Sequence, residues 1–121
     1  MEDAPTGAPR SAEIHFRVDL NERQLPVKIQ WSATDAPEGD ARETKSILLS
    51  VWDGEQKRAM CIDLWTKDML VDEMRIFVVQ TLFTMADTLE RATSERAMAD
   101  GIRGLANRFA DELGESREGS A

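Results

Sequence analysis

Two apolar runs separated by a turn constrain the fold of this chain more than any other feature. They lie within residues 47–74, whose sequence is ILLSVWDGEQKRAMCIDLWTKDMLVDEM. Each run carries a tryptophan, Trp52 or Trp65, and the Asp53-Gly54 pair between them is typical of a hairpin turn. After Trp65 the two-residue period stops. We therefore predict two strands, residues 45–52 and 58–65, that lead directly into a helix.

Two further strands are predicted before this hairpin. Apolar residues at positions 14, 16, 18 and 20 alternate with polar ones, which indicates a strand with one buried face over residues 13–20. A polar turn at residues 21–24 precedes a second strand that ends near Ala33, with Pro26 at its first position, where no ladder donor is needed. Residues 34–44, TDAPEGDARET, are predicted to form an acidic loop.

Two helices are predicted after the hairpin. Thr66 or Asp68 is placed to cap the first helix, Ser94 to cap the second, and Gly114 to end it. Two glycines inside the second helix each cost about 1 kcal/mol against alanine, which is tolerable if another backbone comes close to them. These glycines are Gly101 and Gly104.

These elements predict one α+β domain with the order β-β-β-β-α-α. Four strands form an antiparallel sheet, and a two-helix hairpin packs on one face of it. The length of 121 residues suits one core. We assign this domain to residues 13–114. Residues 1–12 are rich in Pro, Ala, Gly and Ser, and both they and residues 115–121 are predicted to be disordered tails.

The net charge argues against two classes of binding partner, and the cysteine content argues against a disulfide. The net charge of −8 disfavours nucleic acid and anionic membrane surfaces, because both bind basic faces. A single cysteine excludes an internal disulfide. No apolar run is long enough to insert into a membrane, and the N-terminus does not resemble a signal peptide. We expect a soluble cytoplasmic protein.

No catalytic, cofactor-binding or metal-binding residues are predicted. His15 is the one histidine, and it alternates onto a solvated strand face without a nucleophile nearby in the sequence. Cys61 would need a base or a positive neighbourhood to act as a nucleophile, and we expect a small buried side chain instead. Asp87, Glu90 and Arg91 have the pattern of a solvated helix face. No cofactor is expected.

The two faces of the predicted hairpin differ in what they present. If Ile47, Leu49, Val51, Met60, Ile62 and Leu64 face the helices, the opposite face carries both tryptophans. We take that face as a candidate protein-contact surface, because exposed apolar patches that contain tryptophan are typical of interfaces. A homo-oligomer, a segment of the same chain or a different partner could each cover it. Its candidate residues are Leu48, Trp52, Cys61 and Trp65.

The motifs ILLSVWD, IDLWTKDMLVDEM and MADTLERAT resemble the GldC family of gliding motility-associated proteins. The earlier run EIHFRVDLNERQLPVKIQWSATD is also similar to the start of that family. The resemblance implies a small accessory protein of the gliding machinery and its associated type IX secretion system. It implies no enzyme activity, metal or cofactor.

Three classes of function remain open from the sequence. The first is a non-enzymatic adaptor, forming a homo-oligomer and contacting components of motility or secretion. The second is a holdase chaperone, because the order of four strands followed by two helices is similar to that of the SecB-type export chaperone. The third, an enzyme or small-molecule binder, would need a deep pocket with converging polar groups.

Overall fold

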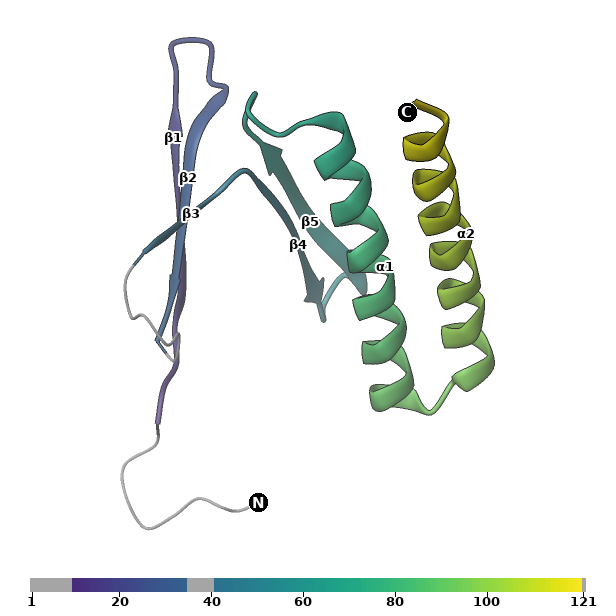
Figure 1. Ribbon diagram of the computed structural model, residues 1–121. Coiled ribbons are helices and arrows are strands. Elements are labelled where there is room, and N and C mark those ends of the chain that lie inside the picture. Colours follow the sequence, from purple (N-terminus) through teal and green to yellow (C-terminus); the bar gives the residue numbers. More distant parts are fainter. Residues whose placement is uncertain (1–9, 35–40, 121) are drawn as a thin grey trace. The chain divides into compact units, whose positions relative to one another are not determined.

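The computed structural model describes residues 10–34 and 41–120. Its elements along the chain are β1 (Ile14–Leu20), β2 (Pro26–Ala33), β3 (Arg42–Thr44), β4 (Ser46–Asp53), β5 (Arg58–Trp65), α1 (Val71–Thr93) and α2 (Arg96–Ser120) (Figure 1). The chain divides into two compact units, one with all the strands and the other, from Leu70 onward, with both helices. Most of the predicted N-terminal tail lies outside the described residues.

The first sheet follows the order β1-β2-β3 and is antiparallel. Phe16 lies opposite Trp31, and Val18 lies opposite Ile29, so the alternating apolar residues share one face as the sequence predicts. Ile29 has no exposed surface. The turn between β1 and β2 closes through a hydrogen bond from the Gln24 amide to the Asn21 carbonyl (2.9 Å).

The predicted single sheet of four strands is wrong, because the strands form two sheets. Residues 42–44, which were predicted to be part of the acidic loop, form β3 and pair with β2. Among the described strands, β4 pairs only with β5. The change of partner occurs at Lys45. The Thr44 hydroxyl donates to the Ser46 carbonyl (3.3 Å), and the Thr66 amide donates to the Lys45 carbonyl (2.9 Å). The chain therefore leaves β2 and joins β5 at this bend.

The predicted hairpin is confirmed as β4 and β5. Its turn occupies residues 54–57, and the Asp53 carboxylate accepts hydrogen bonds from the amides of Glu55 (3.0 Å) and Gln56 (3.3 Å). Lys57 has a positive φ of 55° and donates its amide to the Asp53 carbonyl (2.8 Å). Aspartate at the first turn position thus supplies acceptors for the amides that the turn exposes.

The predicted helix caps are wrong at three positions. Helix α1 begins after Leu70, whose amide donates to the Glu73 carboxylate (2.9 Å), so neither Thr66 nor Asp68 caps it. Ser94 ends α1 in the left-handed conformation rather than starting α2, and its amide bonds the Glu90 carbonyl (2.9 Å). Helix α2 continues past Gly114 to Ser120, through the residues assigned to a tail. Ser94 therefore belongs to the end of α1, and α2 begins at Arg96.

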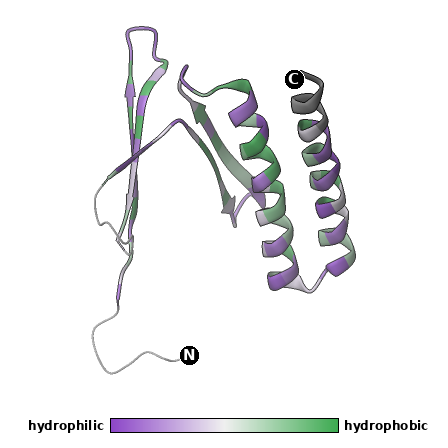
Figure 2. Ribbon diagram, viewed as in Figure 1, coloured by the Kyte–Doolittle hydropathy of each residue, from purple (hydrophilic) through white to green (hydrophobic). Residues whose placement is uncertain are grey.

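Small side chains fill the contact between α1 and α2. Ala86 of α1 and Ala99 and Ala106 of α2 have no exposed surface. Alanine at these positions lets two helices approach closely, since no longer side chain separates their backbones. Both helices alternate hydrophobic and hydrophilic segments along their length (Figure 2), and larger residues such as Met98 remain exposed.

A charged cluster at Arg103 also joins the two helices. The Arg103 guanidinium lies 2.8 Å from carboxylate oxygens of Asp87, Glu90 and Asp100. The hydrogen bonds that Arg103 donates to Asp87 first, then to Glu90 and Asp100, raise the pKa of Arg103 above its usual value. Asp87 and Glu90 therefore do not form the purely solvated helix face that the sequence suggested, because Arg103 of α2 contacts both.

The two glycines within α2 should tolerate alanine. A Cβ added at Gly101 or Gly104 would meet no described atom within 4 Å, so no other described part of this chain comes close to either glycine. Each Gly→Ala change is expected to raise the free energy of unfolding by about 0.5–1 kcal/mol, because glycine loses more backbone entropy in a helix. Chemical denaturation of the purified wild type and of each variant checks this. Destabilisation would mean that another molecule packs there.

The α+β class, the two helices and the antiparallel pairing are thus confirmed. The packing of the helical hairpin on one sheet face stays a prediction.

Candidate interaction surface

The register of β4 and β5 gathers the predicted contact residues on one face. Leu48 lies opposite Asp63, Ser50 opposite Cys61 and Trp52 opposite Ala59, and directly opposed residues share a face of an antiparallel pair. We call this the tryptophan face. Its members are Ser46, Leu48, Ser50, Trp52, Ala59, Cys61, Asp63 and Trp65.

The large side chains of the tryptophan face are exposed to solvent. Trp52 is 65% exposed, Trp65 53% and Leu48 47%. Cys61 is also exposed, with its sulfur 3.4 Å from the Ser50 hydroxyl, so the expectation of a buried cysteine is wrong. The sequence correctly grouped these side chains by their two-residue period. It could not indicate whether another element covers them.

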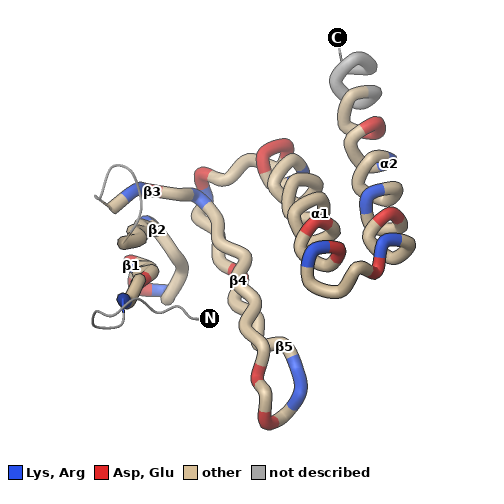
Figure 3. The backbone as a smooth tube through the Cα atoms, turned by 90° about the horizontal axis from the view of Figure 1, so that it is seen from below, with Lys and Arg blue, Asp and Glu red and all other residues tan. Residues whose placement is uncertain are grey.

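The opposite face of the hairpin is apolar as well. Ile47 is buried near the base, whereas Val51, Met60 and Ile62 toward the turn are each about half exposed. Charged residues of the hairpin gather at its turn, and most of β4 consists of uncharged residues (Figure 3). A two-stranded hairpin with two apolar faces needs cover from other elements or another molecule, because such hairpins are marginal alone in water.

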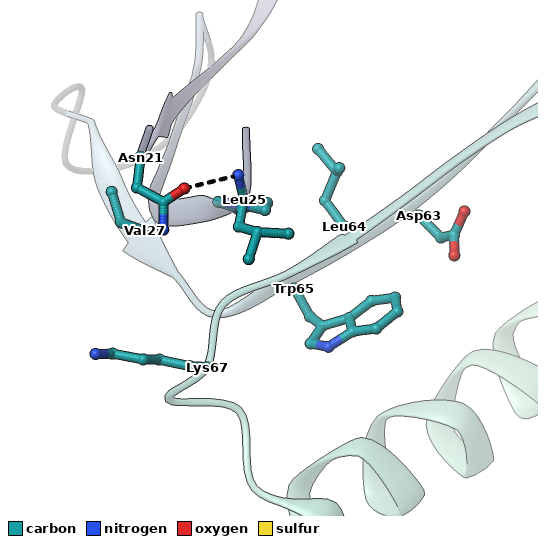
Figure 4. A pocket seen from close by; sticks show the side chains of 8 residues that line it. Asn21, Leu25, Val27, Asp63, Leu64, Trp65 and Lys67 are labelled. Atoms are coloured by element: carbon teal, nitrogen blue, oxygen red, sulfur yellow. Dashed lines mark hydrogen bonds between the residues drawn. The ribbon is translucent and has the colours of Figure 1, made fainter. Parts of the chain in front are cut away.

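An open pocket lies beside Trp65 at the base of the hairpin (Figure 4). Its volume is about 380 Å³, and most of its lining is apolar. The Asn21 side chain shapes one wall, since its oxygen accepts hydrogen bonds from the amides of Arg23 (2.8 Å) and Leu25 (3.1 Å). The lining residues are Asn21, Leu25, Pro26, Val27, Asp63, Leu64, Trp65 and Lys67.

Sequence reasoning missed this pocket. The signal available in the sequence was Leu25, an apolar residue next to the polar turn. In the structure its side chain is 54% exposed. The pocket combines apolar walls with one carboxylate and one ammonium group at its rim, Asp63 and Lys67. Such a site suits an apolar side chain better than a reaction that needs converging catalytic groups.

The titratable residues considered from the sequence do not converge. The imidazole of His15 on β1 forms a hydrogen bond with the carboxylate of Glu13, just before the strand (2.7 Å), and both side chains are well exposed. Among residues 10–34 and 41–120, no three histidine, cysteine or acidic side chains group in a way that could hold a metal ion.

A protein-family model matches most of the chain. The family model described as "Gliding motility-associated protein GldC-like" covers residues 26–115. The chain belongs to the GldC-like family. That match begins with β2, includes the tryptophan face and all of α1, and ends within α2. The family resemblance expected from the central motifs is thereby confirmed.

The family associates the chain with gliding motility. No curated protein and no solved structure matches it. Within the part of the chain that the structure describes, neither helix has the length and apolar character needed to cross a membrane.

Proposed function

We propose that this GldC-like protein is a non-enzymatic accessory protein that acts through protein–protein contacts. Its setting is the gliding motility machinery and the type IX secretion system associated with it. Family membership supports the link to motility. The observation that carries the contact mechanism is the exposed tryptophan face, with two large aromatic side chains and Leu48 on one side of a hairpin.

The composition of the tryptophan face supports a protein partner. Tryptophan contributes large binding energies when a partner removes it from water, and such anchors are surrounded by polar groups at the rim. Here Ser46, Ser50 and Asp63 lie between or beside the apolar residues. The neighbouring pocket has room for one further apolar side chain of a partner. We propose a homo-oligomer as the state that presents this face.

Replacing both tryptophans by alanine should abolish partner capture. Truncation of a central aromatic anchor costs about 2 kcal/mol or more, which is about a 30-fold loss of affinity for each side chain. The measurement is a crosslinked affinity purification from the native host, comparing wild type with Trp52→Ala/Trp65→Ala. One or two motility or secretion components should be enriched with wild type and lost with the variant.

The matched control is Met85→Ala/Met98→Ala, which truncates two comparably exposed apolar residues on the helices. Capture of the same components by the control is expected. Equal capture by the tryptophan variant, shown to be folded by circular dichroism, would contradict the proposed contact surface.

A holdase that binds unfolded clients is the second candidate function. Apolar side chains exposed on both faces of the hairpin favour it, together with the open apolar pocket. Unfolded chains offer many weakly matching apolar segments, so a holdase would capture a long list of unrelated nascent or exported proteins. The same purification separates the candidates, because an accessory protein enriches few specific components.

A further inference from the structure

The outer edge of β4 lacks the features that protect free strand edges. β4 pairs with β5 along one edge, and no described strand pairs along the other. Between Ser46 and Asp53 the strand reads ILLSVW, without charge or proline. Natural sheets protect exposed edges with charged residues, prolines or bulges, since an open edge pairs readily with another chain. This edge has neither charge nor proline.

Other strands with an open edge carry charges. β1 holds His15, Arg17 and Asp19, with an ion pair between Arg17 and Asp19 (3.2 Å). β5 contains Arg58 and Asp63. Charged side chains on an edge strand oppose pairing with a second strand. β4 is therefore the long described strand best suited to accept another strand.

Backbone directions show which groups of β4 point outward. The Thr66 amide bonds the Lys45 carbonyl, so Lys45 faces β5. Residues alternate in direction along a strand, which turns the amides and carbonyls of even-numbered residues away from β5. At Ser46 these groups contact the Thr44 hydroxyl (3.3 and 3.5 Å). The open part of the edge thus consists of Leu48, Ser50 and Trp52.

We propose that β4 of a second copy of this chain pairs antiparallel with this edge, with Ser50 on the two-fold axis. In this register the two Ser50 residues lie opposite each other, and Leu48 of each copy lies opposite Trp52 of the other. All three outward-facing residues then find a hydrogen-bonding partner. Directly opposed side chains of an antiparallel pair are neighbours on one face, so this register brings leucine and tryptophan into apolar contact. On the other face, Leu49 lies opposite Val51.

This dimer joins two hairpins into one sheet with the strand order β5-β4-β4-β5. The two-fold axis between antiparallel strands is perpendicular to the sheet, so both tryptophan faces lie on the same side. The dimer would present a continuous tryptophan face of double size to the partner. The inference therefore deepens the proposed function, and it depends on that function for the role of this surface. The dimer itself is tested on purified protein without any partner.

The test of register is disulfide crosslinking in a Cys61→Ser background. That background is necessary because Cys61 lies 3.4 Å from the Ser50 hydroxyl and would compete within one chain. Directly opposed residues of a hydrogen-bonded pair have Cα atoms about 5.5 Å apart, within the range that a disulfide spans. Ser50→Cys should therefore form a covalent dimer under mild oxidation. Leu49→Cys and Arg17→Cys are the controls and should not.

The test of the edge itself is Ser50→Pro, with Ser50→Ala as its control. Proline removes an outward amide, which the pairing of β4 with β5 does not use. Light scattering should show wild type and Ser50→Ala at twice the 13.6 kDa chain mass and Ser50→Pro at that mass, with unchanged circular dichroism.

A monomeric wild type would overturn the proposal, as would crosslinking at Leu49→Cys rather than at Ser50→Cys. A Ser50→Pro protein that remains dimeric would also overturn it. If Ser50→Pro fails to fold, the crosslinking result decides alone. Loss of the dimer would remove the homo-oligomer from the proposed function but leave the accessory role standing, because partner capture through the tryptophans is measured separately.

Discussion

Replacing Ile29 by alanine should lower the free energy of unfolding by about 2–5 kcal/mol. Among the described residues, Ile29 is the one large side chain with essentially no exposed surface. It lies on β2 between Val18 of β1 and Thr44 of β3, so its removal leaves a cavity where the three strands meet. Urea denaturation followed by circular dichroism measures the loss.

Val27→Ala is the matched control on the same strand. Val27 is 47% exposed, so its truncation removes fewer contacts and should cost under about 1 kcal/mol. Similar losses for the two variants would contradict the assignment of Ile29 as the centre of this sheet's core. They would indicate that another molecule or element buries Val27.

Replacing Ala106 by leucine should destabilise the helical hairpin by about 1–3 kcal/mol. Ala106 has no exposed surface, and Ala86 and Ala99 are equally buried in the same unit. Extra methylene groups would have to force α1 and α2 apart or adopt unfavourable rotamers. The expected result is a lower midpoint of thermal unfolding, measured from the helical signal in circular dichroism.

Ala97→Leu supplies the comparison, because Ala97 lies on the exposed side of the same helix. That change should stay within about 0.5 kcal/mol of wild type. A neutral or stabilising effect of Ala106→Leu would show that the two helices do not pack closely at this position.

The element types followed from local sequence, and the cap positions did not. Alternation over β1 and β2 and the Asp53-Gly54 turn are local signals, and the strands and turn lie where they were predicted. Helix caps depend on which competing polar residue reaches a free amide. Glu73 rather than Thr66 or Asp68 serves α1, and Ser94 closes α1 instead of opening α2.

The sequence predicted which residues share the contact surface, but not which of them are exposed or what lies beside them. Leu48, Trp52, Cys61 and Trp65 share a face because strand side chains alternate, and the sequence shows that directly. The exposure of Cys61 depends on what packs above it, which no local pattern contains. The pocket beside Trp65 also depends on residues distant in sequence, since Asn21 and Leu25 line it with Lys67.

The sequence by itself determined the α+β class, the apolar hairpin and the GldC-like family, because each depends on short-range periodicity or on motifs of adjacent residues. Only the tertiary structure decided that the strands divide into two sheets. That division depends on hydrogen bonds at the bend, where the Thr66 amide donates to the carbonyl of Lys45, twenty-one positions away. Each strand edge can pair with the edge of more than one other strand, and these pairings are mutually exclusive. Which pairing forms depends on backbone geometry that side-chain patterns do not encode.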